Sequence, residues 1–338
     1  MNSTRKPSYR IHPLRNRRSG NRKHLGTELD KLIRRAIRHD RRTISQLMSL
    51  AENDPHSRLE ILAKLYWRGK RSDVIGITGP PGCGKSTLIA QLAKVYRAGG
   101  YSVGVVAVDP SSQITGGALL GDRIRMSDLA ADPKVFIRSM ATRGHFGGIA
   151  RATEDAVRIL AATSTDRVVI ETAGAGQSDV DVKALADTTV VVTSPGLGDE
   201  IQALKAGIME IGDIFVVNKS DKENADQTVQ EIYSMITMGD PIDGWRPRVI
   251  KTTATTGEGI IALSDVIGEH IKHVRSSTLA HSNMEKVRRE VLGAARRYFD
   301  DIKLQEIESS KRFKRVVAEV EAQCMDPYTA ARALVEGN

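Results

Sequence analysis

The sequence predicts an α/β protein with a mostly parallel central sheet and helical extensions at both ends. Between residues 73 and 273, short runs rich in Val and Ile alternate with longer stretches of helical periodicity, as in strand–helix–strand units. Apolar residues recur at helical spacing on both sides of this region. Hydrophobic residues make up 40% of the 338-residue chain and aromatic residues only 4%, so we expect a sizeable and mainly aliphatic core.

Seven segments are predicted to be strands, because β-branched residues dominate them and turn residues bound them. Helical stretches such as STLIAQLAKVYRAGG (86–100) separate them, so we expect helices on both faces of the sheet. The seven segments are 73–79, 101–109, 134–139, 167–174, 188–194, 213–221 and 248–254.

The flanking regions are predicted to be helical. Three helical patterns precede the first strand, at 29–37, 43–51 and 58–67, and the Asp54–Pro55 break separates the last two. A charged helical segment at 283–313 and a short helix after Pro327 follow the strand region. The predicted domains are a basic disordered arm (1–26), an N-terminal helical region (27–70), the α/β domain (71–275) and a C-terminal helical arm (276–338).

The formal net charge of +9 is concentrated at the N-terminus. Residues 1–27 hold eight Lys or Arg and no acid, so subtracting eight from nine leaves +1 for the rest of the chain. Three interpretations of the arm are open: a solvated disordered tail, a contact with an acidic partner or RNA, and an organellar transit peptide.

The composition also indicates in which cellular compartment the protein is expected. No apolar run approaches the roughly 18 residues that span a bilayer, and no signal-peptide pattern is present. Only Cys83 and Cys324 are cysteines, which excludes a disulfide framework and a zinc site built on cysteines. We therefore expect a cytoplasmic protein.

A phosphate-binding loop follows the first predicted strand. The stretch GPPGCGKST satisfies G-x-x-x-x-G-K-[ST] and precedes a predicted helix, the setting of the P-loop of nucleoside triphosphatases. Backbone N–H groups would face the phosphates, Lys85 would add charge and Ser86 would supply a hydroxyl for Mg²⁺. Cys83 is interpreted as a small space-filling residue, with a redox switch as the alternative. The candidate phosphate ligands are Gly79, Gly82, Cys83, Gly84, Lys85, Ser86 and Thr87.

A carboxylate ends another apolar strand. In RVVIETAGAGQSD, Glu171 holds the position of the second carboxylate that orients Mg²⁺ in P-loop proteins, and Gly174 holds the position whose N–H senses a γ-phosphate. A solvated strand end is the alternative interpretation. Gln177 is a candidate for orienting the attacking water, although its spacing from Gly174 is unusual.

The base is predicted to be guanine. Asn218, Lys219 and Asp221 form an N-K-x-D pattern after a strand, in which the Asp accepts two N–H groups that guanine has and adenine lacks. Thr253 and Ala254 resemble the loop that contacts guanine O6. GTP is therefore favoured over ATP, with an ATP-dependent small-molecule kinase as the alternative.

Besides the phosphate-binding loop, five stretches resemble a known family. They are VAVDPSS (106–112), TGGALLGDRIRM (115–126), FGG (146–148), ETAGAGQSD (171–179) and PGLGDEIQALKAGIME (195–210). From about Asp30 to the C-terminus, the chain resembles the MeaB/MMAA/ArgK-type G-protein chaperones of adenosylcobalamin-dependent acyl-CoA mutases.

The resemblance implies roles for further residues. Asp109 is expected to contribute to the Mg²⁺ environment, and Asp122 matches a switch I acid that approaches the metal. The expected metal ligands are thus Ser86, Asp109, Asp122 and Glu171. The expected catalytic residues are Lys85, Asp122, Glu171 and Gln177.

The resemblance also implies a function. GTP binding and hydrolysis would gate adenosylcobalamin delivery to methylmalonyl-CoA mutase or a related isobutyryl- or 2-hydroxyisobutyryl-CoA mutase, and would protect or reactivate it. The C-terminal arm would form a homodimer, or alternatively pack as a solvated helix on its own domain. The rival classes are a metal-insertion GTPase of the nickel-maturation type and an RNA-binding GTPase. The former would carry Cys or His clusters, and the latter would carry an aromatic stacking platform.

Overall fold

The predicted sheet is confirmed in the computed structural model. The structure describes residues 19–66, 72–109, 126–141, 151–163, 165–172, 182–196, 211–237, 244–281 and 283–336. Seven parallel strands form one sheet in the order β3-β2-β4-β1-β5-β6-β7. The strands are β1 (Asp73–Thr78), β2 (Val103–Asp109), β3 (Val135–Ala141), β4 (Arg167–Glu171), β5 (Thr188–Thr193), β6 (Ile214–Asn218) and β7 (Arg248–Thr252).

Six of these strands end earlier than the sequence pattern suggests or at the same residue, and only β3 runs two residues longer than predicted. β4 ends at Glu171, three residues before the predicted end, and β6 ends at Asn218, also three residues early. At both points polar residues succeed the apolar run. Backbone pairing between strands therefore stops at the residue where polar side chains begin to line the carboxyl end of the sheet.

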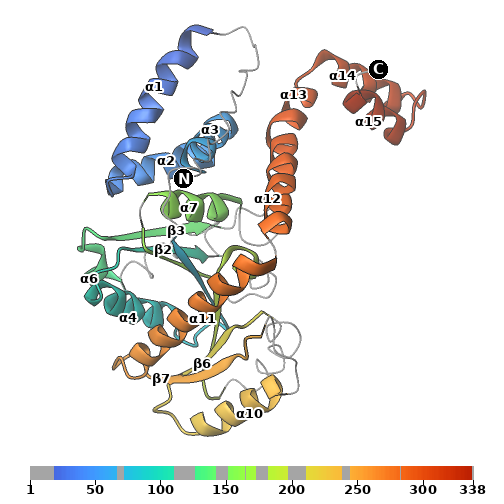
Figure 1. Cartoon of the computed structure of the whole chain (residues 1–338). Helices are drawn as coiled ribbons and strands as arrows, with labels where there is room; N and C mark the ends of the chain where they lie inside the picture. Colours follow the sequence, from blue (N-terminus) through green and yellow to red (C-terminus); the bar gives the residue numbers. More distant parts are fainter. Residues whose placement is uncertain are drawn as a thin grey trace, which may run out of the picture.

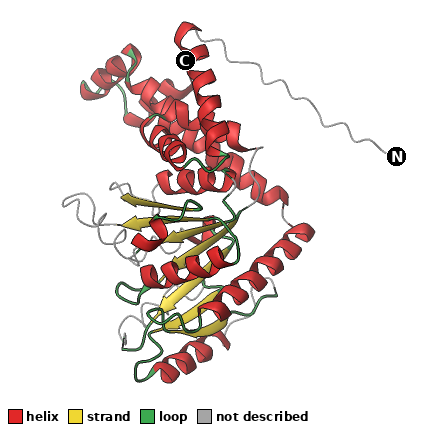
Figure 2. Cartoon of the chain, turned by 90° about the vertical axis from the view of Figure 1, so that its left-hand side faces the viewer, coloured by secondary structure: helices red, strands yellow, loops and turns green. Residues whose placement is uncertain are grey.

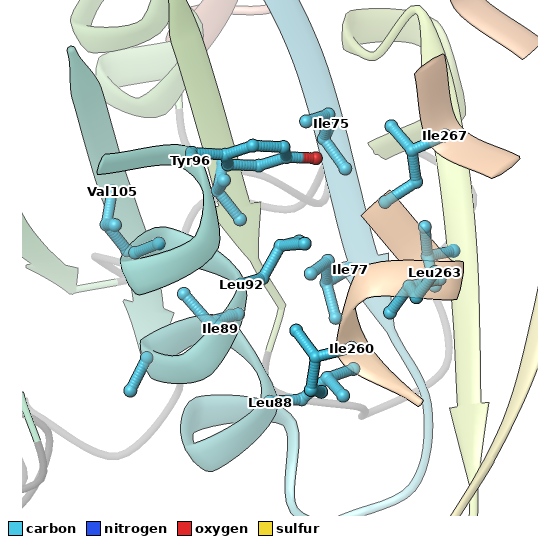
Figure 3. Packing of buried hydrophobic residues seen from close by; sticks show 14 of the residues in the cluster. Ile75, Ile77, Leu88, Ile89, Leu92, Tyr96, Val105, Ile260, Leu263 and Ile267 are labelled. Atoms are coloured by element: carbon cyan, nitrogen blue, oxygen red, sulfur yellow. The ribbon is translucent and has the colours of Figure 1, made fainter. Parts of the chain in front are cut away.

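One face of the sheet is covered by α4 (Lys85–Ala98), α6 (Ser127–Ala130) and α11 (Ile260–His281). Figure 3 shows Leu92 of α4 and Leu263 of α11 on either side of Ile77 from β1. All three side chains are fully buried. The aliphatic core predicted from the composition therefore lies directly beneath the loop that joins β1 to α4.

The opposite face is covered by α7 (Arg151–Ala162) and by three N-terminal helices, α1 (Ser19–Ala36), α2 (Arg41–Asn53) and α3 (Pro55–Tyr66) (Figure 1). On this same face, α10 (Ala225–Thr237) covers β6 and β7, with Ile232 packed in one cluster with Phe215. Helices therefore flank the sheet on both sides, as Figure 2 shows from the side. Within the described ranges, no helix is both long and apolar enough to cross a membrane.

Local polar contacts set the ends of the N-terminal helices. The Asp40 side chain accepts a hydrogen bond from the Thr43 N–H at the start of α2, and Asp54 accepts one from the Ser57 N–H at the start of α3. The predicted break at Asp54–Pro55 is confirmed. α1 begins at Ser19, eight residues before the predicted start of the helical region, and residues 1–18 of the predicted arm lie outside the described residues.

The C-terminal region is helical but not continuous. The pattern predicts one helical segment over 283–313, whereas the chain forms α12 (Asn283–Tyr298), a π-helical turn η2 (Phe299–Lys303) and α13 (Leu304–Glu308), followed by α14 (Lys311–Glu321). The break arises because the Ser310 hydroxyl accepts the Phe313 N–H and caps α14. α15 (Pro327–Glu336) begins at Pro327 as predicted. Figure 1 shows α12 leading from the sheet toward α14 and α15 at the far end.

Leu92→Ala tests the placement of the core beneath this loop. Leu92 is 0% exposed, so its truncation is expected to lower the free energy of unfolding by about 2–5 kcal/mol. Leu50→Ala is the matched control, because Leu50 is 38% exposed and its loss should cost no more than about 1 kcal/mol. Urea unfolding followed by circular dichroism measures both. Equal losses would contradict this core assignment.

Candidate functional site

The candidate site begins with the loop between β1 and α4, whose glycines have conformations that other residues cannot easily adopt. Gly79 has a φ of 135°, and a Cβ on it would lie 1.9 Å from the Val192 carbonyl oxygen of β5. Gly84 has a φ of 98°, and a Cβ there would lie 2.4 Å from Asn218 Nδ2. Both glycines are therefore required by close neighbours as well as by backbone geometry.

The loop folds around the side chain of Lys85. The Lys85 Nζ donates to the carbonyl oxygens of Gly79 at 2.7 Å and Pro80 at 2.9 Å, and the side chain is buried. The ammonium group is thus held inside the loop, at the amino end of α4. An anion at this position would meet the ammonium charge and the helix N-terminus together.

Cys83 lies within the same loop and is fully buried. Burial raises the pKa of its thiol, so the reactive thiolate is scarce at neutral pH. This supports the space-filling interpretation over a redox switch. The other cysteine, Cys324, is exposed and lies beyond α14.

Ser86 and Glu171, two of the predicted metal ligands, lie side by side. The Ser86 hydroxyl donates to Glu171 Oε1 at 2.6 Å, and both side chains are buried. Glu171 ends β4, the direct neighbour of β1 in the sheet. Hydroxyl and carboxylate oxygens are the ligands that Mg²⁺ prefers, so the pair fits this ion. Elsewhere in the described ranges, no group of three His, Cys, Asp or Glu side chains could hold a metal ion.

Gly82 and Thr87 lie in the loop and the first turn of α4, whereas four other residues predicted near the phosphates lie wholly or partly outside the described residues. The backbone of Asp109 ends β2, next to β4 at the same edge of the sheet, but its side chain is not described. Asp122, Gly174 and Gln177 lie outside the described residues altogether.

Two threonines, one at the end of β1 and one just after β4, are hydrogen-bonded to each other beside the loop. The sequence motifs do not identify this pair. The Thr172 hydroxyl donates to the Thr78 hydroxyl at 2.8 Å, and the Thr172 N–H donates to the Ile77 carbonyl at 3.1 Å. Thr78 is the last residue of β1, and Thr172 directly follows β4. A threonine at each of two neighbouring strand ends is the available sequence signal, but it is weak without knowledge of the strand order.

Asn218 connects the phosphate loop to the end of the sheet. It is 2% exposed, and its Nδ2 donates to the Cys83 carbonyl at 2.8 Å. Its Oδ1 accepts from the Ala254 N–H at 3.0 Å and from the Thr252 hydroxyl at 3.1 Å. Three separate chain segments are therefore fixed by one amide side chain.

The rest of the predicted base-reading segment surrounds Asn218. The Lys219 Nζ donates to the Gly82 carbonyl at 2.7 Å, and the Ser220 and Thr253 hydroxyls lie 3.1 Å apart. Asp221 is exposed beside them. The structure therefore brings the N-K-x-D segment, the Thr253–Ala254 loop and the phosphate loop together. Thr252 and Ser220 are contributors that the motif did not identify.

The chain is similar to several known proteins. Residues 44–308 match the family described as methylmalonyl Co-A mutase-associated GTPase MeaB. A Pyrococcus horikoshii protein named "Putative GTPase PH0274" is 45% identical over 317 residues, covering 91% of this chain and 98% of that protein. GTPase ArgK of Escherichia coli is 34% identical, covering 78% of this chain and 80% of that protein.

A mammalian relative and a solved structure extend the comparison. The mouse mitochondrial protein named methylmalonic aciduria type A homolog is 39% identical, but it covers 58% of this chain and the match spans 48% of that protein. The crystal structure of a LAO/AO transport system kinase has a TM-score of 0.66 at 24% identity, covering 92% of this chain and 97% of that one. This structural match supports the fold.

Asn218→Ala tests the connection between the loops. The substitution leaves the Cys83 carbonyl and the Ala254 N–H without their buried partner, and each such group costs about 1–3 kcal/mol. We expect a lower free energy of unfolding and weaker binding of guanine nucleotide, measured by thermal unfolding and by titration with fluorescent GDP. Ser234→Ala, which removes an exposed helix hydroxyl bound to the Gln230 carbonyl, is the control. Unchanged GDP binding in Asn218→Ala would show that the connection is dispensable.

Proposed function

The chain belongs to the MeaB family of GTPases, and from that premise we propose that it is a Mg²⁺-dependent switch acting on an adenosylcobalamin-dependent acyl-CoA mutase. The observation that carries the GTPase chemistry is the contact between the Ser86 hydroxyl and Glu171 beside the enclosed Lys85 ammonium. The proposed partner is supported by the description of the matching family. Methylmalonyl-CoA mutase and the related isobutyryl- and 2-hydroxyisobutyryl-CoA mutases are the candidate partners.

The phosphate loop performs the first task, which is to position the triphosphate. Lys85 would exchange the Gly79 and Pro80 carbonyl oxygens for oxygens of the β- and γ-phosphates, so its charge is present where negative charge develops. Gly82, Gly84 and Thr87 contribute the loop and helix N–H groups around the phosphates.

Ser86 and Glu171 perform the second task. They would hold Mg²⁺, which when bound neutralises phosphate charge, and Asp109 and Asp122 would complete its surroundings. Gln177 would orient the attacking water, and Gly174 would sense the γ-phosphate. Because no strong general base is among these residues, slow intrinsic hydrolysis that a partner accelerates is expected.

Recognition of guanine is the third task. Asp221 would accept the two guanine N–H groups, with the Lys219 stem against the base and the Ala254 backbone near O6. The contacts of Asn218 with Cys83 and Ala254 would keep the base-reading loops in register with the phosphate loop. An ATP-dependent kinase would have no need of this arrangement.

The proposed biological task is to gate delivery of adenosylcobalamin, which belongs to the partner, and to protect or reactivate the mutase. The C-terminal arm, from α12 to α15, is proposed to form a homodimer. A metal-insertion GTPase of the nickel-maturation type is the alternative function.

Glu171→Gln tests the metal role. The amide keeps a partner for Ser86 but removes the negative charge, so the Mg²⁺ concentration for half-maximal GTP hydrolysis should rise about 10- to 100-fold. Binding of GDP without Mg²⁺ should change little, which separates metal binding from folding. Glu258→Gln, an exposed change near the base loop, is the control. An unaltered Mg²⁺ dependence in Glu171→Gln would remove Glu171 from the metal site.

Affinity capture from the native lysate tests the partner. The protein is loaded with GDP or a non-hydrolysable GTP analogue, and bound proteins are identified by mass spectrometry. We expect a cobalamin-binding mutase subunit whose amount depends on the nucleotide. Capture of a nickel enzyme instead would support the alternative, and the absence of any nucleotide-dependent partner would refute the switch.

A further inference from the structure

A cavity of about 590 Å³ is lined by residues of α3, α7 and α12. Figure 1 shows these helices where the N-terminal helices, the α/β domain and the C-terminal arm come together. The volume of the cavity falls in the range of small-molecule pockets, roughly 300–1,000 Å³. It is on the face of the sheet covered by α7, and none of its lining residues belongs to the nucleotide site. Its wall includes Leu59, Leu62, Ala161, Val287, Val291 and Ala294.

The wall is mainly aliphatic. Leu and Ala from α3 and α7 face Val and Ala from α12, and Tyr66 is the one aromatic residue among the lining side chains. Val287 and Val291 stay exposed, at 41% and 60%. A wall of this kind favours a flexible hydrocarbon chain over a planar ring, because there is little aromatic surface on which a ring could stack.

The charged residues of the wall all carry the same sign. Arg58, Arg158 and Arg297 line the cavity, whereas the carboxylates that pair with them do not. Arg158 and Arg297 share a single carboxylate, Glu154, at 2.9 Å each. The guanidinium groups of these ion pairs therefore line the cavity, and their carboxylate partners lie outside its wall.

Arg58 is held in place rather than free to turn away. Its side chain is 7% exposed, its Nε lies 2.6 Å from Asp155 Oδ2, and its Nη1 pairs with Asp301 of η2. A guanidinium fixed in this way keeps its remaining N–H groups in a set direction. Guanidinium groups match carboxylate and phosphate oxygens better than any other cationic side chain does.

We propose that this cavity binds an amphipathic anion, with an aliphatic chain between α3, α7 and α12 and a carboxylate or phosphate head at the arginines. The aliphatic wall removes the chain from water, and guanidinium N–H groups that the paired carboxylates leave over donate to the head. Such a ligand contacts all three parts of the chain at once. The proposal does not depend on the function of the nucleotide site.

Titration calorimetry with the full-length protein tests the proposal. The probes are decanoate and decyl phosphate, which distinguish the two head groups, with decanol and decyltrimethylammonium as uncharged and cationic controls of equal chain length. We expect saturable binding of at least one anion, at least ten-fold tighter than that of decanol and of the cation. Equal binding of all four probes, or no saturable binding below 1 mM, on the order of the weakest specific affinities, would overturn it.

Two variants on α12 locate the binding. Ala294→Phe fills the cavity from an exposed helix position, and we expect it to weaken anion binding at least ten-fold. Ala295→Phe places the same bulk at an exposed neighbouring position that does not line the cavity, and it should bind the anion normally. GDP binding, which should be unchanged in both, reports on folding. Equal effects of the two substitutions would place the ligand elsewhere.

Arg158→Gln tests the head-group contact. Glu154 keeps Arg297 as its partner, so the helices should remain in place while the cavity loses one positive charge. We expect about ten-fold weaker anion binding and unchanged decanol binding.

Repeating the titration at two protein concentrations detects a second copy of the chain in the cavity. Anion affinity that falls as the protein associates would assign the cavity to that copy and refute the ligand site.

Discussion

The position of β1 between β4 and β5 is the constraint on which the nucleotide site depends. In an all-parallel sheet the carboxyl ends of neighbouring strands meet at one edge, so the loop after β1 lies directly beside the end of β4. Ser86 can therefore reach Glu171 although they are 85 residues apart in sequence. The close approach of Gly79 to the Val192 carbonyl follows from the neighbour on the other side. Strand order thus brings a lysine, a hydroxyl and a carboxylate together at the amino end of α4.

The loops at the carboxyl end of the sheet also place the base-reading segment relative to the phosphate loop. β6 is two strands from β1, and this distance is bridged by the Asn218 amide, which bonds the phosphate loop on one side and the Ala254 backbone on the other. The Lys219 ammonium adds a second link to Gly82. A displacement of either loop would break several buried hydrogen bonds at once, which makes the relative placement of the two loops rigid before any nucleotide arrives.

Elements that a short local pattern encodes can be located from the sequence. The seven strands, the phosphate loop, Glu171 and the Asn218 segment could be found because each depends on a short pattern of glycine, charge or β-branched residues. The Thr78–Thr172 pair and the Asn218–Cys83 bond could not, since they depend on which strands are neighbours.

The C-terminal arm shows a different limit. Helical periodicity runs through residues 299–311, so nothing in the spacing reveals the π-helical turn, in which Asp301 pairs with Arg58 of a distant helix. Ser310 did carry a signal, because serine before a charged helical run is a frequent N-cap.

The ion pairs around Arg58 explain how the three parts of the chain keep one arrangement. Arg58 belongs to α3, Asp155 to the first turns of α7 and Asp301 to η2, so a single buried guanidinium contacts the N-terminal helices, the α/β domain and the C-terminal arm. Buried ion pairs add little net stability, but an arrangement that leaves such a charge without its partner is strongly disfavoured. Charge pairing at Asp301 and burial of Ile302, both in η2, therefore hold this part of the C-terminal arm against the rest of the chain.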